Sequence, residues 1–144
     1  MDAWVALPAR LASLEVARQW LVQHLQSVSM APGVLFRIEL VLEELLMNVV
    51  SHGQAHPADG AELSIRLGAE VQGDHLMLCL EDNGIGFDPG AASLPATPAT
   101  LAEARVGGLG LVLVRKSVRS LRHETVGPLN RLWVELPLHP SPAS

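Results

Sequence analysis

The sequence predicts an α/β fold: a two-layer sandwich in which about three helices cover a mixed, mainly antiparallel sheet. Two long stretches, 14–30 and 34–53, repeat apolar residues at helical spacing. Five shorter stretches have the alternation or apolar composition of strands: 3–7, 62–71, 75–81, 121–126 and 132–138. Because helices and strands are segregated along the chain, a two-layer sandwich is favoured over a doubly wound parallel sheet.

Composition limits the classes of protein to which the chain can belong. Its 144 residues, 49% of them hydrophobic and 17% charged, suit one folded domain over 1–144. A net charge of -5 argues against a nucleic-acid-binding protein. We see no targeting segment and no apolar run near the roughly 20 residues of a membrane span. A single cysteine suits a reducing compartment, so we expect a soluble, cytoplasmic protein.

The first strand and the first helix are delimited by their end signals. The apolar run at 3–7 ends at Pro8, which indicates an edge strand. Ser13 is predicted to cap a helix over 14–30, because serine commonly accepts the first free N–H groups of a helix. Pro32 then ends the helical pattern.

The stretch 34–53 predicts a second helix with a wide buried face, and Gly53 fits its C-terminal end. Glu44 and Asn48 stand four residues apart at the edge of that face. On this helix alone the pair fits either an ordinary surface or a base beside a metal ligand. The residues of the buried face are Ile38, Val41, Leu42, Leu45, Leu46 and Val49.

The remaining elements are predicted to be a hairpin, a long loop, a helix and a second hairpin. A tight turn at Gly73 and Asp74 joins the strands 62–71 and 75–81. The segment 89–104, rich in Ala, Pro, Ser and Thr, is predicted to be a mobile lid. A helix follows from 107, and the sequence GPLN is predicted to be the turn between the last two strands.

Two glycine-rich segments have the chemistry of a nucleotide site. Asp82-Asn83-Gly84-Ile85-Gly86-Phe87 follows a strand, where an aspartate can accept a hydrogen bond from an exocyclic amine. Gly107-Gly108-Leu109-Gly110-Leu111 opens a helix, whose free N–H groups suit phosphate. Taken separately, the first also fits an acidic turn and the second a hinge.

Three motifs together, Glu44-Leu-Leu-Met-Asn48, Asp82-Asn-Gly84-Ile-Gly86-Phe87 and Gly108-Leu-Gly110-Leu111, resemble the GHKL family of ATP-binding domains in order and spacing. The resemblance covers about 14–138 and implies a Bergerat-type ATP-binding fold. Within the family, the pattern E-E-x-x-x-N-x-x-x-H-G is most similar to the anti-sigma-factor serine/threonine kinases of bacterial partner-switching systems.

The resemblance implies a role for each motif residue, with ATP/ADP and Mg²⁺ as cofactors. It also implies that Leu132 stands near the adenine, where many relatives carry a polar residue. The implied roles are general base for Glu44, Mg²⁺ ligand for Asn48, adenine recognition for Asp82, shaping of the adenine pocket for Gly84 and Gly86, and phosphate contacts for Arg105, Gly108, Leu109, Gly110 and Leu111.

The resemblance further implies an anti-sigma factor that uses ATP to phosphorylate a serine of a small anti-sigma-factor antagonist and that sequesters a sigma factor. Relatives of this kind often form homodimers, and we expect such an interface at 3–7 and 14–30. Two alternatives stay open: an ATP-binding regulatory module without kinase activity, and the catalytic domain of a histidine kinase.

Overall fold

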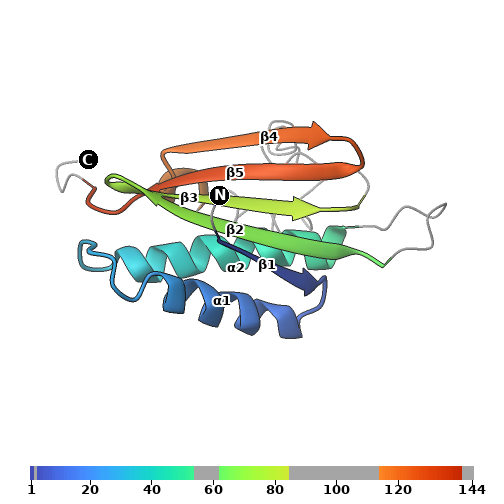
Figure 1. The fold of residues 1–144 in the computed structure, drawn as a ribbon, viewed down its shortest axis with the longest axis horizontal. Coiled ribbons are helices and arrows are strands. Elements are labelled where there is room, and N and C mark those ends of the chain that lie inside the picture. Colours follow the sequence, from blue (N-terminus) through green and yellow to red (C-terminus); the bar gives the residue numbers. More distant parts are fainter. Residues whose placement is uncertain (2, 54–61, 85–113, 141–144) are drawn as a thin grey trace, which may run out of the picture.

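A computed structural model describes residues 1, 3–53, 62–84 and 114–140. In this part of the chain five strands form one antiparallel sheet in the order β1-β2-β3-β5-β4, and two helices pack on one face of it (Figure 1). The predicted two-layer α/β sandwich is confirmed. The elements are β1 (Ala3–Pro8), α1 (Ala12–His24), α2 (Val34–His52), β2 (Ser64–Gln72), β3 (His75–Asp82), β4 (Ser120–Val126) and β5 (Leu129–Pro137), and residues 114–117 are also helical.

The α2 helix supplies the largest share of the helical side of the core. Five of the six residues of its predicted apolar face are buried, and Val49 is partly buried against them. Burying a leucine or isoleucine side chain is worth about 1.5–3 kcal/mol, so this face holds α2 firmly on the sheet. Within the described residues, no helix is long and apolar enough to cross a membrane.

The sheet meets the helices with alternate residues of its central strands. Ile65, Leu67 and Ala69 of β2 are buried on one face, as the alternation of 62–71 predicted. The β2–β3 turn forms where expected, because Gly73 has a φ of 61°, a left-handed conformation that glycine adopts without strain. Alternation also runs the whole length of β5, whose every second residue is buried.

Two predictions about α1 are wrong. The helix begins at Ala12, one residue before the proposed cap, and it ends at His24 rather than near position 30. Ser13 therefore lies inside the helix, where its hydroxyl donates a 2.6 Å hydrogen bond back to the carbonyl of Pro8. The serine fixes the β1–α1 connection instead of satisfying the first N–H groups of the helix.

The prediction that GPLN forms the last turn is also wrong in part. β5 begins at Leu129, so Asn130 belongs to the strand and pairs across the sheet with Asp82 of β3. The turn is made by Gly127 and Pro128, with Gly127 in a left-handed conformation at φ 60°. This shift puts a polar side chain opposite the predicted adenine-binding aspartate.

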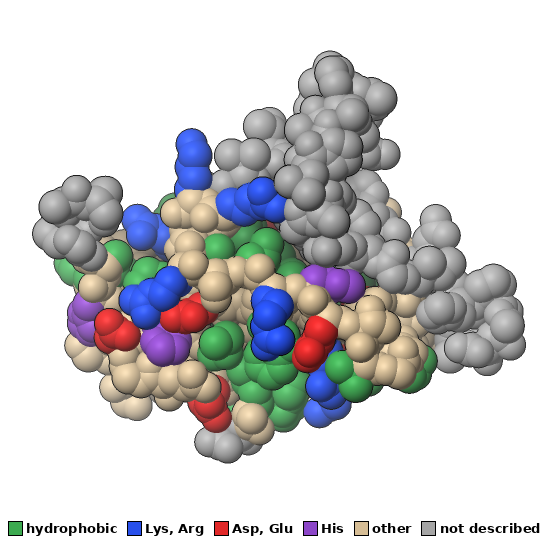
Figure 2. All heavy atoms as spheres, turned by 90° about the horizontal axis from the view of Figure 1, so that it is seen from above, with side chains coloured by type: hydrophobic (Ala, Val, Ile, Leu, Met, Phe, Trp, Pro, Cys, Tyr) green, Lys and Arg blue, Asp and Glu red, His purple; other side chains and the backbone are tan. Residues whose placement is uncertain are grey.

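The edge strand β4 carries charged side chains that pair with its neighbour. Trp133 of β5 donates a 2.8 Å hydrogen bond to Glu124, and Arg119, just before β4, bonds Glu135 at 3.1 Å. Seen from above, basic, acidic and histidine side chains intermingle with hydrophobic ones on the described surface (Figure 2). Charges on an edge strand discourage pairing with other chains.

Gly53 ends α2 as predicted, but its conformation is extended rather than left-handed. A Cβ at this position would lie 2.4 Å from the carbonyl oxygen of Val49 and 2.8 Å from the side chain of Leu63. Glycine is required here because the chain passes too close to that carbonyl for a side chain to fit as it leaves the helix. The end of α2 is thereby held against the start of β2.

Replacing Gly53 with alanine should destabilise the protein by about 1–3 kcal/mol, the usual cost of overpacking, measured from the urea-unfolding midpoint. Gln23→Ala, at an exposed position of α1, is the control, and we expect it to change the stability by no more than about 0.5 kcal/mol. Equal midpoints for the wild type and Gly53→Ala would contradict this explanation.

Candidate nucleotide-binding site

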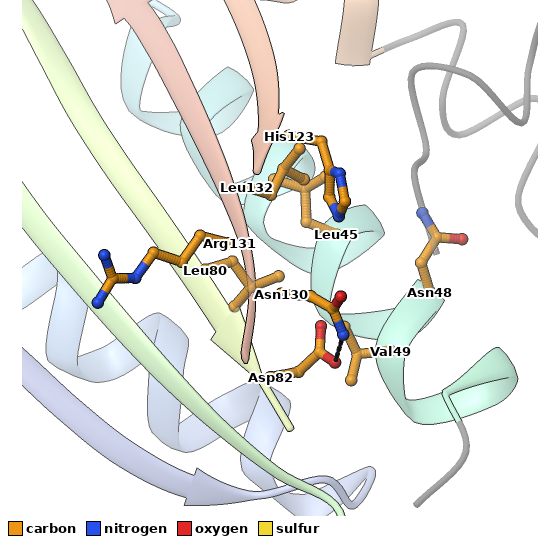
Figure 3. Close-up of a pocket in the computed structure, with 9 residues that line it drawn as sticks. All are labelled: Leu45, Asn48, Val49, Leu80, Asp82, His123, Asn130, Arg131 and Leu132. Carbon is orange, nitrogen blue, oxygen red and sulfur yellow. Dashed lines mark hydrogen bonds between the residues drawn. The ribbon is translucent and has the colours of Figure 1, made fainter. Parts of the chain in front are cut away.

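A pocket opens between α2 and the ends of the three strands β3, β5 and β4 (Figure 3). It encloses about 330 Å³ with the open space at its mouth included. Its walls combine apolar side chains with a few polar ones: Leu45, Asn48, Val49, Leu80, Asp82, His123, Asn130, Arg131 and Leu132.

Asp82, at the end of β3, is held in place by two hydrogen bonds to one oxygen of its carboxylate. Asn130 Nδ2 donates to Asp82 Oδ1 at 3.0 Å, and the backbone N–H of Gly84 donates to the same oxygen at 2.9 Å. Among the described residues, none donates to Oδ2. That oxygen is oriented and available to accept a hydrogen bond from a ligand amine.

Asn130 connects the carboxylate of Asp82 to the backbone of Gly84 at this corner of the pocket. Its Nδ2 also donates to the carbonyl of Gly84 at 2.8 Å, and its side chain is only 6% exposed. Figure 3 shows the amide pointing at the Asp82 carboxylate, beside Val49 of α2. The resemblance suggested Leu132 as the residue near the adenine; Leu132 does line the pocket, but the polar partner of Asp82 is Asn130.

Asn83 faces away from Asp82 and fixes the neighbouring strand. Its Oδ1 accepts a 2.8 Å hydrogen bond from the backbone N–H of Ser64, and its Nδ2 donates at 3.0 Å to the carbonyl of Glu62. The start of β2 is thereby attached to the end of β3. Asp82 therefore projects from the end of β3, which is attached to β2 on one side and paired with β5 on the other.

Asn48 occupies the opposite wall and is 5% exposed. Its side-chain nitrogen has no hydrogen-bond partner among the described residues, although the atom is buried. In Figure 3 the amide leaves α2 on the side away from Asp82. Because an unsatisfied buried amide costs stability, its position points to a polar ligand that completes it.

Asn48 also fits the Mg²⁺ ligand that the motif implies. No group of three or more His, Cys, Asp or Glu side chains could hold a metal within the described part of the chain. Mg²⁺ at a nucleotide site is usually held by one or two protein oxygens together with phosphates and waters. The Asn48 carbonyl oxygen suits that arrangement.

Glu44 lies one turn before Asn48 on α2, and its side chain is half-buried. Burial raises the pKa of the Glu44 carboxyl, and the neighbouring charge of Glu43 raises it further. Glu43 itself is exposed. A carboxylate with a raised pKa is a stronger proton acceptor, which suits a general base.

The structure thus brings Asn48, Asp82 and Gly84 to one region of the fold, with Glu44 on the same helix as Asn48. The other proposed phosphate and adenine residues lie outside the described residues, so their placement stays a prediction: Gly86, Arg105, Gly108, Leu109, Gly110 and Leu111.

Asn130 and His123 are among the pocket residues that sequence reasoning missed. Asn130 was assigned to a turn, although the alternation of β5 extends back to it through Leu132 and Val134. His123 lies on β4 and its Nε2 is buried without a hydrogen-bond partner among the described residues. Nothing in the sequence around His123 signals a ligand, because its position depends on strand pairing.

Comparison with known proteins supports a nucleotide site. Residues 7–136 match the model of the family described as the histidine kinase-like ATPase domain. The serine/threonine-protein kinase BtrW of Bordetella bronchiseptica is 32% identical over 111 residues, which are 76% of this chain and 73% of BtrW.

Solved structures share the fold. A chain of the SiaB–SiaC complex from Pseudomonas aeruginosa aligns with a TM-score of 0.61 and 18% identity, covering 94% of this chain and 89% of that one. The histidine kinase domain of a blue-light activated kinase from Erythrobacter litoralis aligns with a TM-score of 0.53 and 20% identity. That match covers 88% of this chain and 60% of the solved chain of that kinase domain.

Asn130→Ala should weaken nucleotide binding about tenfold or more, because it frees the Asp82 carboxylate to rotate and removes the hydrogen bond that Asn130 donates to the Gly84 carbonyl. Calorimetric titration with ATP measures the effect. Ser13→Ala is the control, since it removes a partly buried hydrogen bond of a residue that does not line the pocket. Both variants should lose about 1–2 kcal/mol of stability. Unchanged ATP affinity in Asn130→Ala would show that the pair does not organise the site.

Proposed function

Because this chain belongs to the histidine kinase-like ATPase domain family, we propose that it is an ATP-dependent protein serine kinase. The observation that carries the proposal is the arrangement of two walls around one pocket. One wall presents a carboxylate with one oxygen fixed by Asn130 and the other available. The α2 wall presents the buried amide of Asn48, which leaves the helix on the side away from Asp82 and whose nitrogen has no hydrogen-bond partner among the described residues.

In this proposal the adenine amine donates to Asp82, and Asn48 lies toward the phosphates. The carboxylate end of the pocket would repel a triphosphate, whereas the apolar side chains of Leu80 and Leu132 suit a flat base. Mg²⁺, when bound between Asn48 and the nucleotide, would neutralise phosphate charge. The segment 85–113, which contains the second glycine box, would supply the remaining phosphate contacts.

Glu44 is the proposed general base. The hydroxyl of the acceptor serine gives its proton to the Glu44 carboxylate as its oxygen forms a bond to the γ-phosphorus, and the bond to ADP breaks. Phosphoryl transfer depends mainly on positioning and charge stabilisation, so one oriented carboxylate is enough to accept the proton of the acceptor hydroxyl. The α2 core face keeps Glu44 and Asn48 in a fixed relation.

The nature of the acceptor is proposed from the relative BtrW, which is named a serine/threonine-protein kinase. We propose that the acceptor is a serine on a small anti-sigma-factor antagonist, and that the chain also holds a sigma factor when the antagonist is phosphorylated. Both partners come from the motif resemblance. Binding of the two would be mutually exclusive, so that phosphorylation shifts the population between the complexes.

The test is transfer of label from [γ-³²P]ATP, with Mg²⁺, to a candidate antagonist encoded beside the gene for this chain. Acid-stable, alkali-labile label on that protein identifies phosphoserine, whereas acid-labile label would indicate phosphohistidine and contradict the serine assignment. Label on neither the antagonist nor the kinase would favour a binding module.

Glu44→Gln should lower the transfer rate by about 10²- to 10⁴-fold, the usual contribution of a general base. The amide keeps the size of the side chain but cannot accept the proton. ATP affinity, measured by calorimetry, should change by less than about threefold, because Glu44 does not line the described pocket. Full transfer activity in the variant would remove Glu44 from the mechanism.

The pH dependence of transfer should report on Glu44. Only the ionised carboxylate accepts a proton, so the rate should fall as the pH drops through the raised pKa of Glu44. Glu43→Gln removes the neighbouring like charge, which lowers that pKa, and the acidic limb should move to lower pH with the same plateau rate. Single-turnover rates across the pH range measure the acidic limb of the wild type and of Glu43→Gln. An identical acidic limb in the two proteins would argue against Glu44 as the base.

A further inference from the structure

Two buried side-chain nitrogens lack hydrogen-bond partners within the described residues, and both belong to the same pocket. They are Asn48 Nδ2 and His123 Nε2. Asn48 belongs to a motif that predicts a ligand, but His123 belongs to none. Buried polar atoms in folded proteins are nearly always satisfied, so a pair of exceptions at one pocket calls for a common explanation.

Strand pairing puts His123 at a defined place relative to Asp82. His123 of β4 is the cross-strand partner of Leu132, which is in turn the partner of Leu80 on β3. Asp82 and Asn130 form the next row of side chains on the same face. The two leucines therefore form an apolar floor with the carboxylate at one end and the imidazole beyond the other (Figure 3).

We propose that His123 is a nucleotide-binding residue whose Nε2 forms a hydrogen bond with the nucleoside part of the ligand. The inference rests on the proposed ATP site. A base whose amine is bound to Asp82 lies over the leucine floor and directs its opposite edge and its ribose toward β4. A ring nitrogen or a ribose hydroxyl can then pair with the imidazole, which either donates or accepts.

A phosphate contact for His123 fits the pocket less well. The surface between Asp82 and His123 is made by the apolar side chains of Leu45, Leu80 and Leu132, all of them buried. Such a surface favours a flat ring over a charged phosphate chain. The uncharged nucleoside, and not the phosphate chain, is therefore expected to lie on this floor.

The experiment compares wild type, His123→Leu and His123→Gln by calorimetric titration with ATP, ADP and adenosine, and by urea unfolding without ligand. His123→Leu should bind all three ligands about tenfold more weakly, the effect of one lost hydrogen bond to a ligand in a desolvated site. His123→Gln, which keeps a donor and an acceptor, should recover most of that affinity.

The unfolding midpoint separates a binding role from a packing role. Without ligand, His123→Leu should be at least as stable as the wild type, because it removes an unpaired buried nitrogen. Equal affinities for the wild type and His123→Leu would overturn this inference and leave the ATP site intact. So would a loss confined to ATP and ADP, or a loss of affinity that accompanies a lower midpoint. A wild-type protein that binds none of the three ligands would overturn the proposed function as well.

Discussion

The site depends on one carboxamide. Asn130 bonds the carboxylate of Asp82 and the carbonyl of Gly84 with the same nitrogen, and it does so from a strand paired in register with β3. The bond to a charged acceptor is among the stronger kinds, and its partial burial reduces competition by water. An aspartate at a strand end would otherwise turn toward solvent. With Asn130 in place, one oxygen is bound and the second has a single direction in which to accept.

The second wall is rigid for a different reason. Asn48 and Glu44 belong to a helix whose apolar face is almost wholly buried against the sheet, so their separation is set by the helix itself. The buried amide of Asn48 and the raised pKa of Glu44 are both unfavourable in the protein alone. Sites that bind and transform ligands commonly retain such costs, because the ligand or the reaction relieves them. Core packing and site chemistry are therefore properties of the same nineteen-residue element, α2.

The sequence predicted most of this arrangement, and its failures have physical reasons. Periodicity located α2 and the hairpin because five helical positions and three strand positions are buried as their spacing requires. It could not locate Asn130, because the sequence Gly-Pro-Leu-Asn resembles a turn until strand pairing extends β5 back to Leu129. Nor could it find His123, whose role arises from its neighbour across the sheet. Ser13 has the residue type of a helix cap, but its hydroxyl bonds Pro8 instead.

The central claim is that the fixed Asp82 carboxylate accepts a hydrogen bond from the adenine amine. Calorimetric titration with ATP and with inosine triphosphate, which carries a carbonyl oxygen in place of that amine, tests it most directly. Inosine triphosphate should bind at least about a hundredfold more weakly, because its carbonyl oxygen would face the carboxylate oxygen where adenine presents a donor. Equal affinities for the two nucleotides would show that Asp82 does not recognise the base.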